Sequence, residues 1–477
     1  MSQKSLPLVL LLAVLTLQGT GIASASDWSR FRGPNGLGVS ETTGLPLEFG
    51  PSQNVVWKTK LPAGKSSPAL TEDRIFLTGH ENGKLLTICL DRATGRILWQ
   101  RAAASRRLEK MNLLNDEASS SPVTDGENVY AFFGGYGLVS YGPDGNQRWT
   151  QPLGPFTNFH GMAASPVLAD EKVLMVVDQD IEAYVIAFNK DDGSIAWKRE
   201  RPDMVHSFST PLVYRPKDGP AELIVPGSYQ MVSYAIDNGN ELWRVRGLTY
   251  QVKSVPVISG DTLYFNGWAP GGMPTARLVL PPFQTAIADY DKDKDGRLSK
   301  AEIPQAWLPG SWNMQDLDKD GMFNKREWFY YSSRRTSSNS TMAIRLGGRG
   351  DVTDTHVLWK YQKSLPDVPS LLLYKGVLFG VKKGGIVTAL DPQTGKVLKQ
   401  GRLPDAVDDY YSSPIGADGK VYMASQGGKV SVLKATGDWP VLATNELGED
   451  VYATPAVSDG RIYLRTMAAL YCFGSKP

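Results

Sequence analysis

Short runs of alternating apolar and polar residues make up most of this chain. Runs such as RIFLTG (74–79) and RIYLRT (461–466) have the two-residue period of a half-buried β-strand. Turns rich in Asp, Asn and Gly separate the runs, and glycine supplies the positive φ that a tight hairpin needs. The pattern predicts an all-β protein of short antiparallel strands, interrupted between residues 268 and 340.

The predicted strands recur as one repeated unit. Each unit opens with a small residue and proline, passes through two strands to a Gly-containing turn, and ends on a strand that in most units carries Trp. Antiparallel units of roughly 40 to 45 residues are typical of propeller blades, which stack because one small sheet cannot bury both faces. The openings are Ser67-Pro68, Ser121-Pro122, Ser165-Pro166, Thr210-Pro211, Val255-Pro256, a looser Val368-Pro369-Ser370, Ser413-Pro414 and Thr454-Pro455. They predict an eight-bladed β-propeller.

The two ends of the chain are expected to complete one blade together. The last unit stops at LYCFG (470–474), short of its fourth strand, while NVVWKTKL (54–61) is an unpaired strand that carries Trp57. Pairing these strands closes the ring and removes its exposed edges.

The fourth-strand tryptophans are interpreted as core between blades, because large aromatic side chains dominate such cores. Lys399 replaces Trp in the sixth unit, and Trp439 is out of register in the seventh. Cys89 and Cys472 occupy equivalent places in the first and last blades. Facing sheets lie about 10 Å apart, and Cα atoms beyond about 7 Å cannot be bridged, so two buried thiols are favoured over a disulfide. The other tryptophans at the fourth-strand position are Trp99, Trp149, Trp197, Trp243 and Trp359.

The phrases DRATGRILW, NKDDGSIAW, AIDNGNELW and ALDPQTGKV resemble the pyrroloquinoline-quinone (PQQ) type of β-propeller repeat, over about residues 54–475. The segment WSRFRGPNGLGVSE (28–41) is similar to the start of a group of exported bacterial PQQ-like propeller proteins. We expect this lead-in, residues 26–53, to pack on the propeller without taking part in chemistry.

The fifth unit contains an insertion. It breaks off after TLYFN (262–266) and resumes with TMAIRL (341–346). Removing the intervening segment restores a unit of ordinary length, so an insertion between the second and third strands of a blade is predicted. The expected domains are therefore propeller over 54–267, insertion over 268–340 and propeller over 341–477.

Two acidic loops in the insertion have the order of an EF-hand pair: carboxylates at positions 1, 3 and 5, glycine at 6 and glutamate at 12. Calcium takes six to eight oxygen ligands, position 7 supplies a backbone carbonyl, and glycine allows the sharp turn. Two tandem matches favour two bound calcium ions, although acidic surface loops without metal remain the alternative. The expected ligands are Asp291, Asp293, Asp295, the Arg297 carbonyl and Glu302, then Asp316, Asp318, Asp320, the Met322 carbonyl and Glu327.

Local patterns predict the rest of the insertion. PFQTAIADY (282–290) has helical spacing, Asn324 with Glu327 forms a capping-box pattern, and Leu298 is placed to pair with Phe323. The middle helices are expected to be short, and the insertion to have no large core besides its ions. Lysines crowd the first loop, so we expect calcium dissociation constants on the order of 10⁻⁵ to 10⁻³ M and a structural role. The insertion should lie beside the channel mouth.

Charge and the N-terminus limit the functions to consider. Lys plus Arg (51) balances Asp plus Glu (49), so no nucleic-acid partner is indicated. Residues 1–25 have the pattern of an export signal, with Lys4, an apolar run too short to span a membrane, and a small-residue cleavage site; an uncleaved anchor is the alternative. The mature chain is expected to be a periplasmic or extracellular monomer without a transmembrane segment.

Polar residues ahead of the unit openings are expected to line the channel mouth, where a ligand is most often sought. An exported binding or scaffold protein is favoured, with an unidentified protein or carbohydrate ligand at the propeller face, and the blades resemble those of the propeller subunit of the outer-membrane β-barrel assembly machinery. These mouth residues are Lys65, Glu117, His160, His206, Gln251, Lys253, Asp367, Asp409 and Asp450.

Two alternatives remain open. One is a PQQ-dependent dehydrogenase of alcohols or sugars, as the repeat resemblance implies. The chain has no adjacent cysteine pair and no CxxCH haem site, and its recognisable calcium loops lie in the insertion, so bound PQQ and enzymatic activity are not expected. The other is carbohydrate binding by Tyr410, Tyr411 and Tyr452, whose aromatic faces suit sugars.

Overall fold

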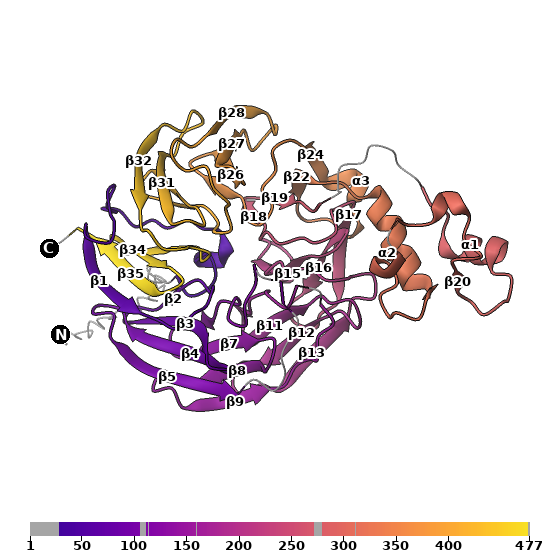
Figure 1. Ribbon diagram of the computed structural model, residues 1–477, viewed down its shortest axis with the longest axis horizontal. Coiled ribbons are helices and arrows are strands. Elements are labelled where there is room, and N and C mark those ends of the chain that lie inside the picture. The colour runs from indigo at the N-terminus through magenta and orange to yellow at the C-terminus, as the bar shows by residue number, and fades with distance from the viewer. Residues whose placement is uncertain are drawn as a thin grey trace, which may run out of the picture.

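The protein is an eight-bladed β-propeller with few helices (Figure 1). The computed structural model describes residues 28–104, 111–112, 114–158, 160–270, 279–310 and 312–475. The predicted export signal, residues 1–25, lies outside the described residues. Each blade is a four-stranded antiparallel sheet whose first strand is innermost, and blade 4 gains one further strand.

The first four blades follow one another along the chain. Blade 1 contains β2 (Ala69–Leu70), β3 (Arg74–Glu81), β4 (Lys84–Asp91) and β5 (Ile97–Ala104). Blade 2 contains β6 (Val123–Thr124), β7 (Val129–Phe133), β8 (Gly137–Tyr141) and β9 (Gln147–Gln151). Blade 3 contains β10 (Val167–Ala169), β11 (Lys172–Val177), β12 (Tyr184–Asn189) and β13 (Ile195–Glu200). Blade 4 contains β14 (Leu212–Tyr214), β15 (Glu222–Pro226), β16 (Gln230–Ala235), β17 (Glu241–Arg246) and β23 (Gly350–Asp351).

The last four blades complete the ring. Blade 5 contains β18 (Val257–Ser259), β19 (Thr262–Gly267), β22 (Ser340–Arg345) and β24 (Val357–Tyr361), with α3 (Thr353–His356) before its last strand. Blade 6 contains β25 (Leu372–Tyr374), β26 (Val377–Lys382), β27 (Ile386–Leu390) and β28 (Val397–Arg402). Blade 7 contains β29 (Ile415–Ala417), β30 (Lys420–Ala424), β31 (Lys429–Lys434) and β32 (Val441–Glu446). Blade 8 contains β33 (Ala456–Ser458), β34 (Arg461–Arg465), β35 (Ala469–Gly474) and β1 (Val55–Lys60).

The strand β1 pairs antiparallel with β35, so residues from both ends of the chain build blade 8. Trp57 of β1 lies opposite Cys472 of β35. Cys472 and Cys89 are both free and buried, which confirms the two thiols favoured from the sequence. Burial raises the pKa of Cys89 to about 12 and that of Cys472 to about 11.

The small residue that opens each unit forms a ring of hydrogen bonds around the channel. In seven steps around the ring the backbone N–H of one blade's opening residue donates to the hydroxyl of the next, as from Ser67 to Ser121 at 2.9 Å. A backbone N–H must find a partner when buried, which explains the repeated Ser or Thr. In blade 6 this position is Ser370, so the predicted opening at Val368-Pro369 is wrong by two residues. Val255 of blade 5 has no hydroxyl to accept from blade 4.

The fourth-strand tryptophans dock on the third-strand turn of the following blade. The Trp149 indole N–H donates to the Lys190 carbonyl at 2.9 Å, and a Cβ on Gly193 (φ 74°) would lie 2.6 Å from the Trp149 ring. Trp57, Trp99, Trp197 and Trp359 make the same kind of bond. The interpretation of these side chains as inter-blade core is confirmed.

Two positions depart from this docking pattern. Trp243 instead donates to Glu222 of its own blade at 2.7 Å. Lys399, which replaces Trp in blade 6, donates to the Asp438 carbonyl at 2.6 Å, and its ammonium lies 4.0 Å from the centre of the Trp439 ring. The out-of-register Trp439 therefore supplies from blade 7 the aromatic ring that blade 6 lacks.

The lead-in crosses the channel from blade to blade. It contains η1 (Pro34–Gly36), and its backbone accepts hydrogen bonds from Leu70 and Thr124, at the ends of the innermost strands β2 and β6. Arg30 and Arg32 are buried and donate to carbonyls of blades 4 and 6. The lead-in therefore packs on the propeller as expected.

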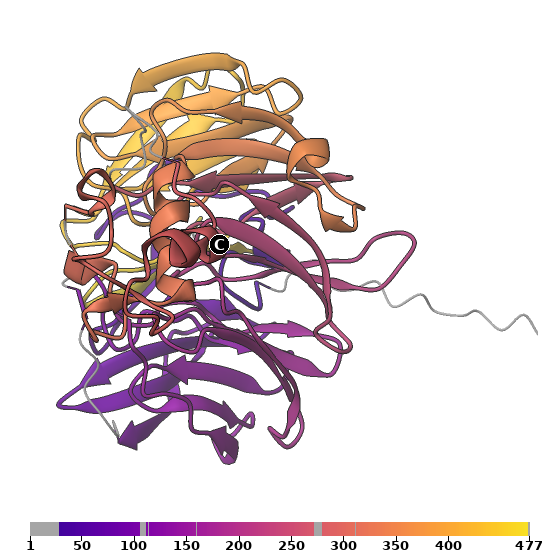
Figure 2. The same cartoon turned by 90° about the vertical axis from the view of Figure 1, so that its right-hand side faces the viewer.

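The segment between β19 and β22 is a small helical unit (Figures 1 and 2). Leu298 pairs with Phe323 and the Asn324–Glu327 capping box is formed, as the sequence predicts. Its elements are α1 (Phe283–Tyr290), β20 (Leu298–Ser299), η2 (Gln305–Trp307), η3 (Trp312–Met314), β21 (Met322–Phe323) and α2 (Lys325–Thr336). Within the described ranges, none of the protein's helices is both long and apolar enough to cross a bilayer.

The helical unit has an aromatic core, so the expectation that it lacks one is wrong. The rings of Trp312 and Phe323 stack with centres 4.1 Å apart, and Trp328 and Tyr331 pack around them. The sequence shows these aromatic residues, but their spacing across two loops and two 3₁₀ turns has no helical period to reveal it.

Candidate functional site

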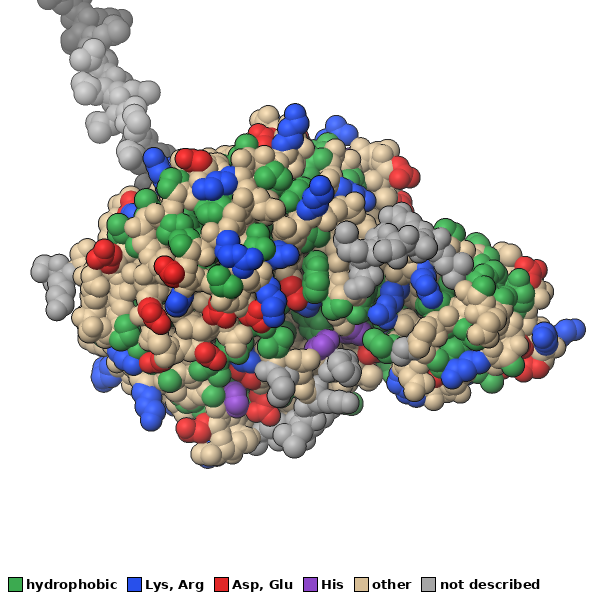
Figure 3. Space-filling view, turned by 45° about the horizontal axis from the view of Figure 1, so that its top comes forward, with side chains coloured by type: hydrophobic (Ala, Val, Ile, Leu, Met, Phe, Trp, Pro, Cys, Tyr) green, Lys and Arg blue, Asp and Glu red, His purple; other side chains and the backbone are tan. Residues whose placement is uncertain are grey.

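A cavity of about 400 Å³ lies at the channel mouth. Its volume is within the range of small-ligand pockets. The opening hydroxyls of several blades face it, and Phe31 of the lead-in reaches it from within the channel. Figure 3 shows histidine side chains at a hollow near the inserted segment, with acidic and basic side chains intermixed around it.

The sequence identified part of this lining. Of the residues predicted to line the mouth, Lys65, His160, Gln251, Lys253 and Asp367 do so, and Tyr411 and Tyr452 join them. Glu117, His206, Asp409, Asp450 and Tyr410 do not line the cavity. Tyr410 is buried and donates to the Ala406 carbonyl at 2.8 Å. Sequence reasoning missed Phe31 in the lead-in and Asn112 and Asn115 in an irregular segment without a repeat signal. It also missed Phe208, which stands two residues ahead of the Thr210 opening but is not polar.

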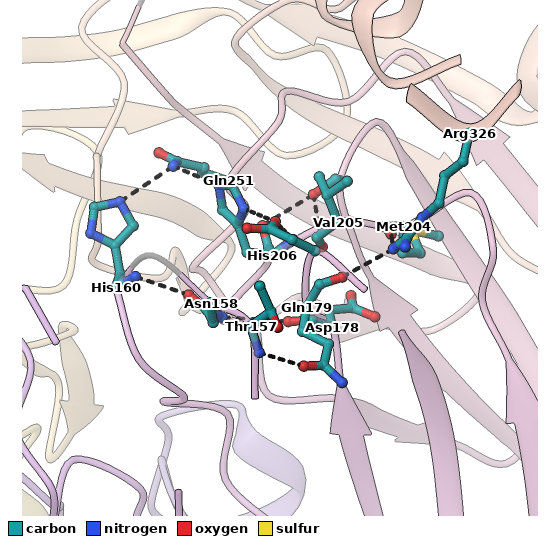
Figure 4. Close-up of polar contacts among 12 residues, drawn as sticks. Thr157, Asn158, His160, Asp178, Gln179, Met204, Val205, His206, Gln251 and Arg326 are labelled. Atoms are coloured by element: carbon teal, nitrogen blue, oxygen red, sulfur yellow. Dashed lines mark hydrogen bonds and ion pairs between the residues drawn. The ribbon is translucent and has the colours of Figure 1, made fainter. Parts of the chain in front are cut away.

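Four polar side chains form a hydrogen-bonded chain that starts at the cavity lining and continues behind it; His160, Gln251 and His206 of this chain are labelled in Figure 4. The Gln251 amide nitrogen lies 2.9 Å from His206 Nε2 and 3.3 Å from His160 Nε2. His206 Nδ1 in turn contacts Asp180 Oδ1. Because an amide nitrogen only donates, both Nε2 atoms accept, and His206 carries its proton on Nδ1 toward Asp180. Burial, followed by electrostatic interactions with His206 and Lys253, lowers the pKa of His160.

A buried ion pair lies next to this chain of hydrogen bonds. Arg201 Nε lies 2.7 Å from Asp178 Oδ1, and both side chains are 0% exposed. Ser207, next to His206, donates to Asp178 at 2.5 Å. Burial alone would lower the pKa of Arg201, but the charge of Asp178 leaves it raised. The ion pair fixes the backbone that carries His206.

Cations and aromatic rings line the opposite side of the cavity. Tyr411 and Tyr452 stack with ring centres 5.4 Å apart, and the Lys65 ammonium lies 4.3 Å from the Tyr452 ring centre. Burial lowers the pKa of Lys65. Lys253 is paired with Asp367 at 2.6 Å. Besides these charged groups, a ligand would meet flat rings, hydroxyls and the amides of Asn112, Asn115 and Gln251.

The first acidic loop holds oxygen atoms of Asp291, Asp293 and Glu302 within 4.8 Å of one another. Glu302 accepts from the backbone of Lys292 at 2.9 Å and of Ser299 at 2.8 Å, and the Ser299 backbone bond leads the causes that lower its pKa. Asp295 stands outside this group of three and accepts from its neighbour Arg297.

The second acidic loop gathers Asp316, Asp318 and Asp320, again within 4.8 Å. Asp316 is 4% exposed, and its Oδ1 has no hydrogen-bond partner among the described residues, while Oδ2 accepts from Gly321 at 3.1 Å. Glu327 is bound to backbone N–H groups of the loop, with Leu317 at 2.6 Å, and burial raises its pKa. A buried carboxylate oxygen without a partner is costly, and a hard cation would satisfy it.

The profile described as outer membrane protein assembly factor BamB matches residues 50–164, 120–267 and 347–473. The chain belongs to this family. The matched ranges do not include the helical insertion, so the insertion is not part of the pattern that defines the BamB family. No curated protein matches the chain.

Solved structures show the same fold. BamB from Moraxella catarrhalis is 13% identical, covers 88% of this chain and 98% of its own, and has a TM-score of 0.55. A europium-containing methanol dehydrogenase is 11% identical, covers 93% and 89%, with a TM-score of 0.58. Quinohemoprotein alcohol dehydrogenase from Comamonas testosteroni is 11% identical, covers 95% and 82%, with a TM-score of 0.57. At these identities the likeness concerns the propeller alone.

Proposed function

We propose that this BamB-family chain is an exported calcium-binding protein that acts as a binding or scaffold module. Two calcium ions would order the helical insertion, and the channel-mouth cavity would take a protein segment or a carbohydrate. The observation that carries the calcium part is the second loop, where Asp316 is buried with one carboxylate oxygen unpartnered beside Asp318 and Asp320.

The charges of the loops support a modest calcium affinity. Three carboxylates so close together repel one another, and a divalent cation offsets that repulsion. The first loop also carries Lys292, Lys294 and Lys300, which compete with the cation. Arg297 already pairs with Asp320 across the two loops. These cations favour the weaker dissociation constants suited to an extracellular or periplasmic calcium level.

Calcium titration of the purified mature chain tests the calcium part. Isothermal titration calorimetry should give two ions per chain for the wild type and none for the Asp291→Ala/Asp316→Ala double variant, with the far-ultraviolet β signal of the propeller retained. Undiminished calcium uptake by the double variant would refute the ligand assignment.

The binding role of the cavity is supported by its lining. Tyr411 and Tyr452 offer flat faces, while Gln251 and the Ser and Thr hydroxyls of the blade openings offer directed hydrogen bonds. This combination suits sugars and peptide segments. A panel of oligosaccharides and peptides, measured by titration against the wild type and Gln251→Ala, tests this part. Binding unaffected by Gln251→Ala would place the ligand elsewhere.

A second candidate is a PQQ-dependent oxidoreductase, because two of the similar folds belong to alcohol-oxidising enzymes. The two cysteines lie apart on β4 and β35, so they cannot form an adjacent pair near the cavity. Incubation with PQQ and calcium, followed by absorbance and dye-linked oxidation of alcohols and sugars, separates the candidates. Retained cofactor with turnover would replace the scaffold proposal by the enzyme.

A further inference from the structure

The helix α2 touches both the second acidic loop and the loops behind the channel-mouth cavity. Glu327 in its first turn is the last carboxylate of the acidic loop and binds the Leu317 and Asp318 N–H groups. Its neighbour Arg326 donates to the Met204 carbonyl at 2.7 Å and to the Gln179 carbonyl at 3.2 Å (Figure 4). Since these two residues are adjacent, any displacement of one moves the other.

Arg326 is held by carbonyls rather than by a carboxylate. Its guanidinium donates to these two carbonyls, and among the described residues its buried Nε has no hydrogen-bond partner. Burial lowers its pKa. The guanidinium therefore joins α2 to blade 3 through hydrogen bonds of fixed geometry.

The two carbonyls belong to the segments that build the polar chain of the cavity. Gln179 directly precedes Asp180, and Met204 lies two residues before His206. Gln179 also accepts from the Thr157 N–H at 2.7 Å, on the segment that leads to His160. A path of hydrogen bonds and of residues adjacent in sequence therefore leads from Arg326 to the cavity, through Asp180, His206 and Gln251.

Apolar packing makes the same connection. Leu317, which stands inside the second acidic loop, is buried with Val205, Tyr229, Tyr250 and Tyr330. The Tyr229 and Tyr330 ring centres are 5.8 Å apart. Val205 precedes His206 and Tyr250 precedes Gln251, so the loop side chain packs against the sequence neighbours of both residues.

Backbone strain shows that surrounding contacts hold these segments in place. Gln251 has φ 72° and Tyr229 has φ 68°, in the left-handed region that costs a non-glycine residue free energy. Such conformations persist only where neighbouring contacts over-determine them. For Tyr229, the ring of Tyr330 in α2 is one such contact.

The first acidic loop has no such connection. Its hydrogen bonds in the described ranges stay within the insertion, and Figure 1 shows α1 and β20 projecting beyond the propeller, with α2 between them and the blades. The two loops, although equal in ligand pattern, differ in what they touch.

We propose that calcium in the second loop, Asp316 to Glu327, stabilises the cavity-lining residues Gln251 and His160 through Asp180 and His206 behind them, with Arg326 and Leu317 transmitting the effect. The first loop orders the insertion only. This inference rests on the proposed calcium binding and adds to it that ligand binding at the channel mouth is linked to the second ion. By linkage, a ligand held by these lining residues strengthens calcium binding in the second loop equally.

Hydrogen–deuterium exchange of the full mature chain tests the proposal, with peptides covering 202–210 and 248–254 followed in calcium and in chelator. Calcium should slow exchange there by at least about fivefold, the lower end of usual coupling between sites. Asp318→Ala should abolish the slowing. Asp293→Ala, at the equivalent position of the first loop, should leave it in place and serves as the matched control.

The Arg326→Gln variant separates calcium binding from its effect on the residues beside the cavity. Calorimetry should still count two calcium ions, while the slowing at 202–210 falls to less than about twofold. Lys325→Gln, which removes an exposed charge from the same helical turn, should behave as the wild type.

The outcomes separate the two proposals. Two bound ions with no slowing at either peptide in the wild type, or equal slowing in Arg326→Gln, overturn this inference alone. A wild type that takes up no calcium overturns the proposed function and this inference together.

Discussion

Replacing Asp178 by alanine should strongly destabilise the propeller beside the cavity. Asp178 and Arg201 are both 0% exposed and lie 2.7 Å apart, so the variant leaves an uncompensated buried guanidinium. Breaking such a pair costs about 3–5 kcal/mol. Ser207 also loses its acceptor, which places the cost at the upper end, about 5 kcal/mol.

Urea unfolding followed by tryptophan fluorescence measures this cost. With a slope of about 3 kcal/mol/M, the Asp178→Ala midpoint should fall by about 1.7 M. Asp178→Ala/Arg201→Met should recover most of the loss, because an apolar pair of similar volume replaces the ions without leaving a charge. Arg215→Ala, which breaks an ion pair exposed by 56% and 39%, should cost less than about 1 kcal/mol.

Two results would refute this reasoning. One is a cost below about 1 kcal/mol for Asp178→Ala, which would mean that Arg201 finds other compensation. The other is a double variant no more stable than the single one, which would show that packing volume, not the buried charge, determines the loss.

Three further predictions concern other parts of the molecule. His160 should titrate in NMR below the usual value of about 6.5; because the folded pKa is lowered, its contribution to stability is present above about 6.5 and is lost as pH falls toward the folded value, and His160→Gln should remove that part of the pH dependence. Trp149→Ala should cost about 3–5 kcal/mol in urea unfolding, and Trp149→Phe less. Cys89 and Cys472 should react with a thiol reagent only on unfolding, since burial raises both pKa values; rapid modification of the native chain would contradict their placement.

The fold could be predicted from sequence because each blade repeats its own physical requirements. A hydroxyl accepts the next N–H around the channel, and Trp packs on a glycine turn, so both recur at fixed spacing. Blade 6 was misread where Ser370 lacks the following proline that marks the other Ser and Thr openings. The contribution of β23 to blade 4 was invisible, because two residues pairing in parallel carry no pattern.

The candidate site was only partly predictable for the opposite reason. The carboxylates of the acidic loops follow one another at short intervals, so their proximity is local. Asp180 lies between β11 and β12 of blade 3, His160 between blades 2 and 3, and Gln251 between blades 4 and 5, so only folding brings them together. Their relation to Arg326 depends on how the insertion leans on the propeller, which no spacing encodes.

The ring of hydroxyls has one gap, at Val255, and its position has a consequence for how the molecule tolerates its extra segment. Blades 4 and 5 lack the hydrogen bond between opening residues that joins every other neighbouring pair of blades. Instead, β23, from the segment before the last strand of blade 5, pairs with β17 of blade 4. Blades 4 and 5 are therefore joined through their outer strands rather than beside the channel. The connection between β19 and β22, in which the helices reside, takes no part in this contact, so it can lengthen without loosening blade 4 from blade 5.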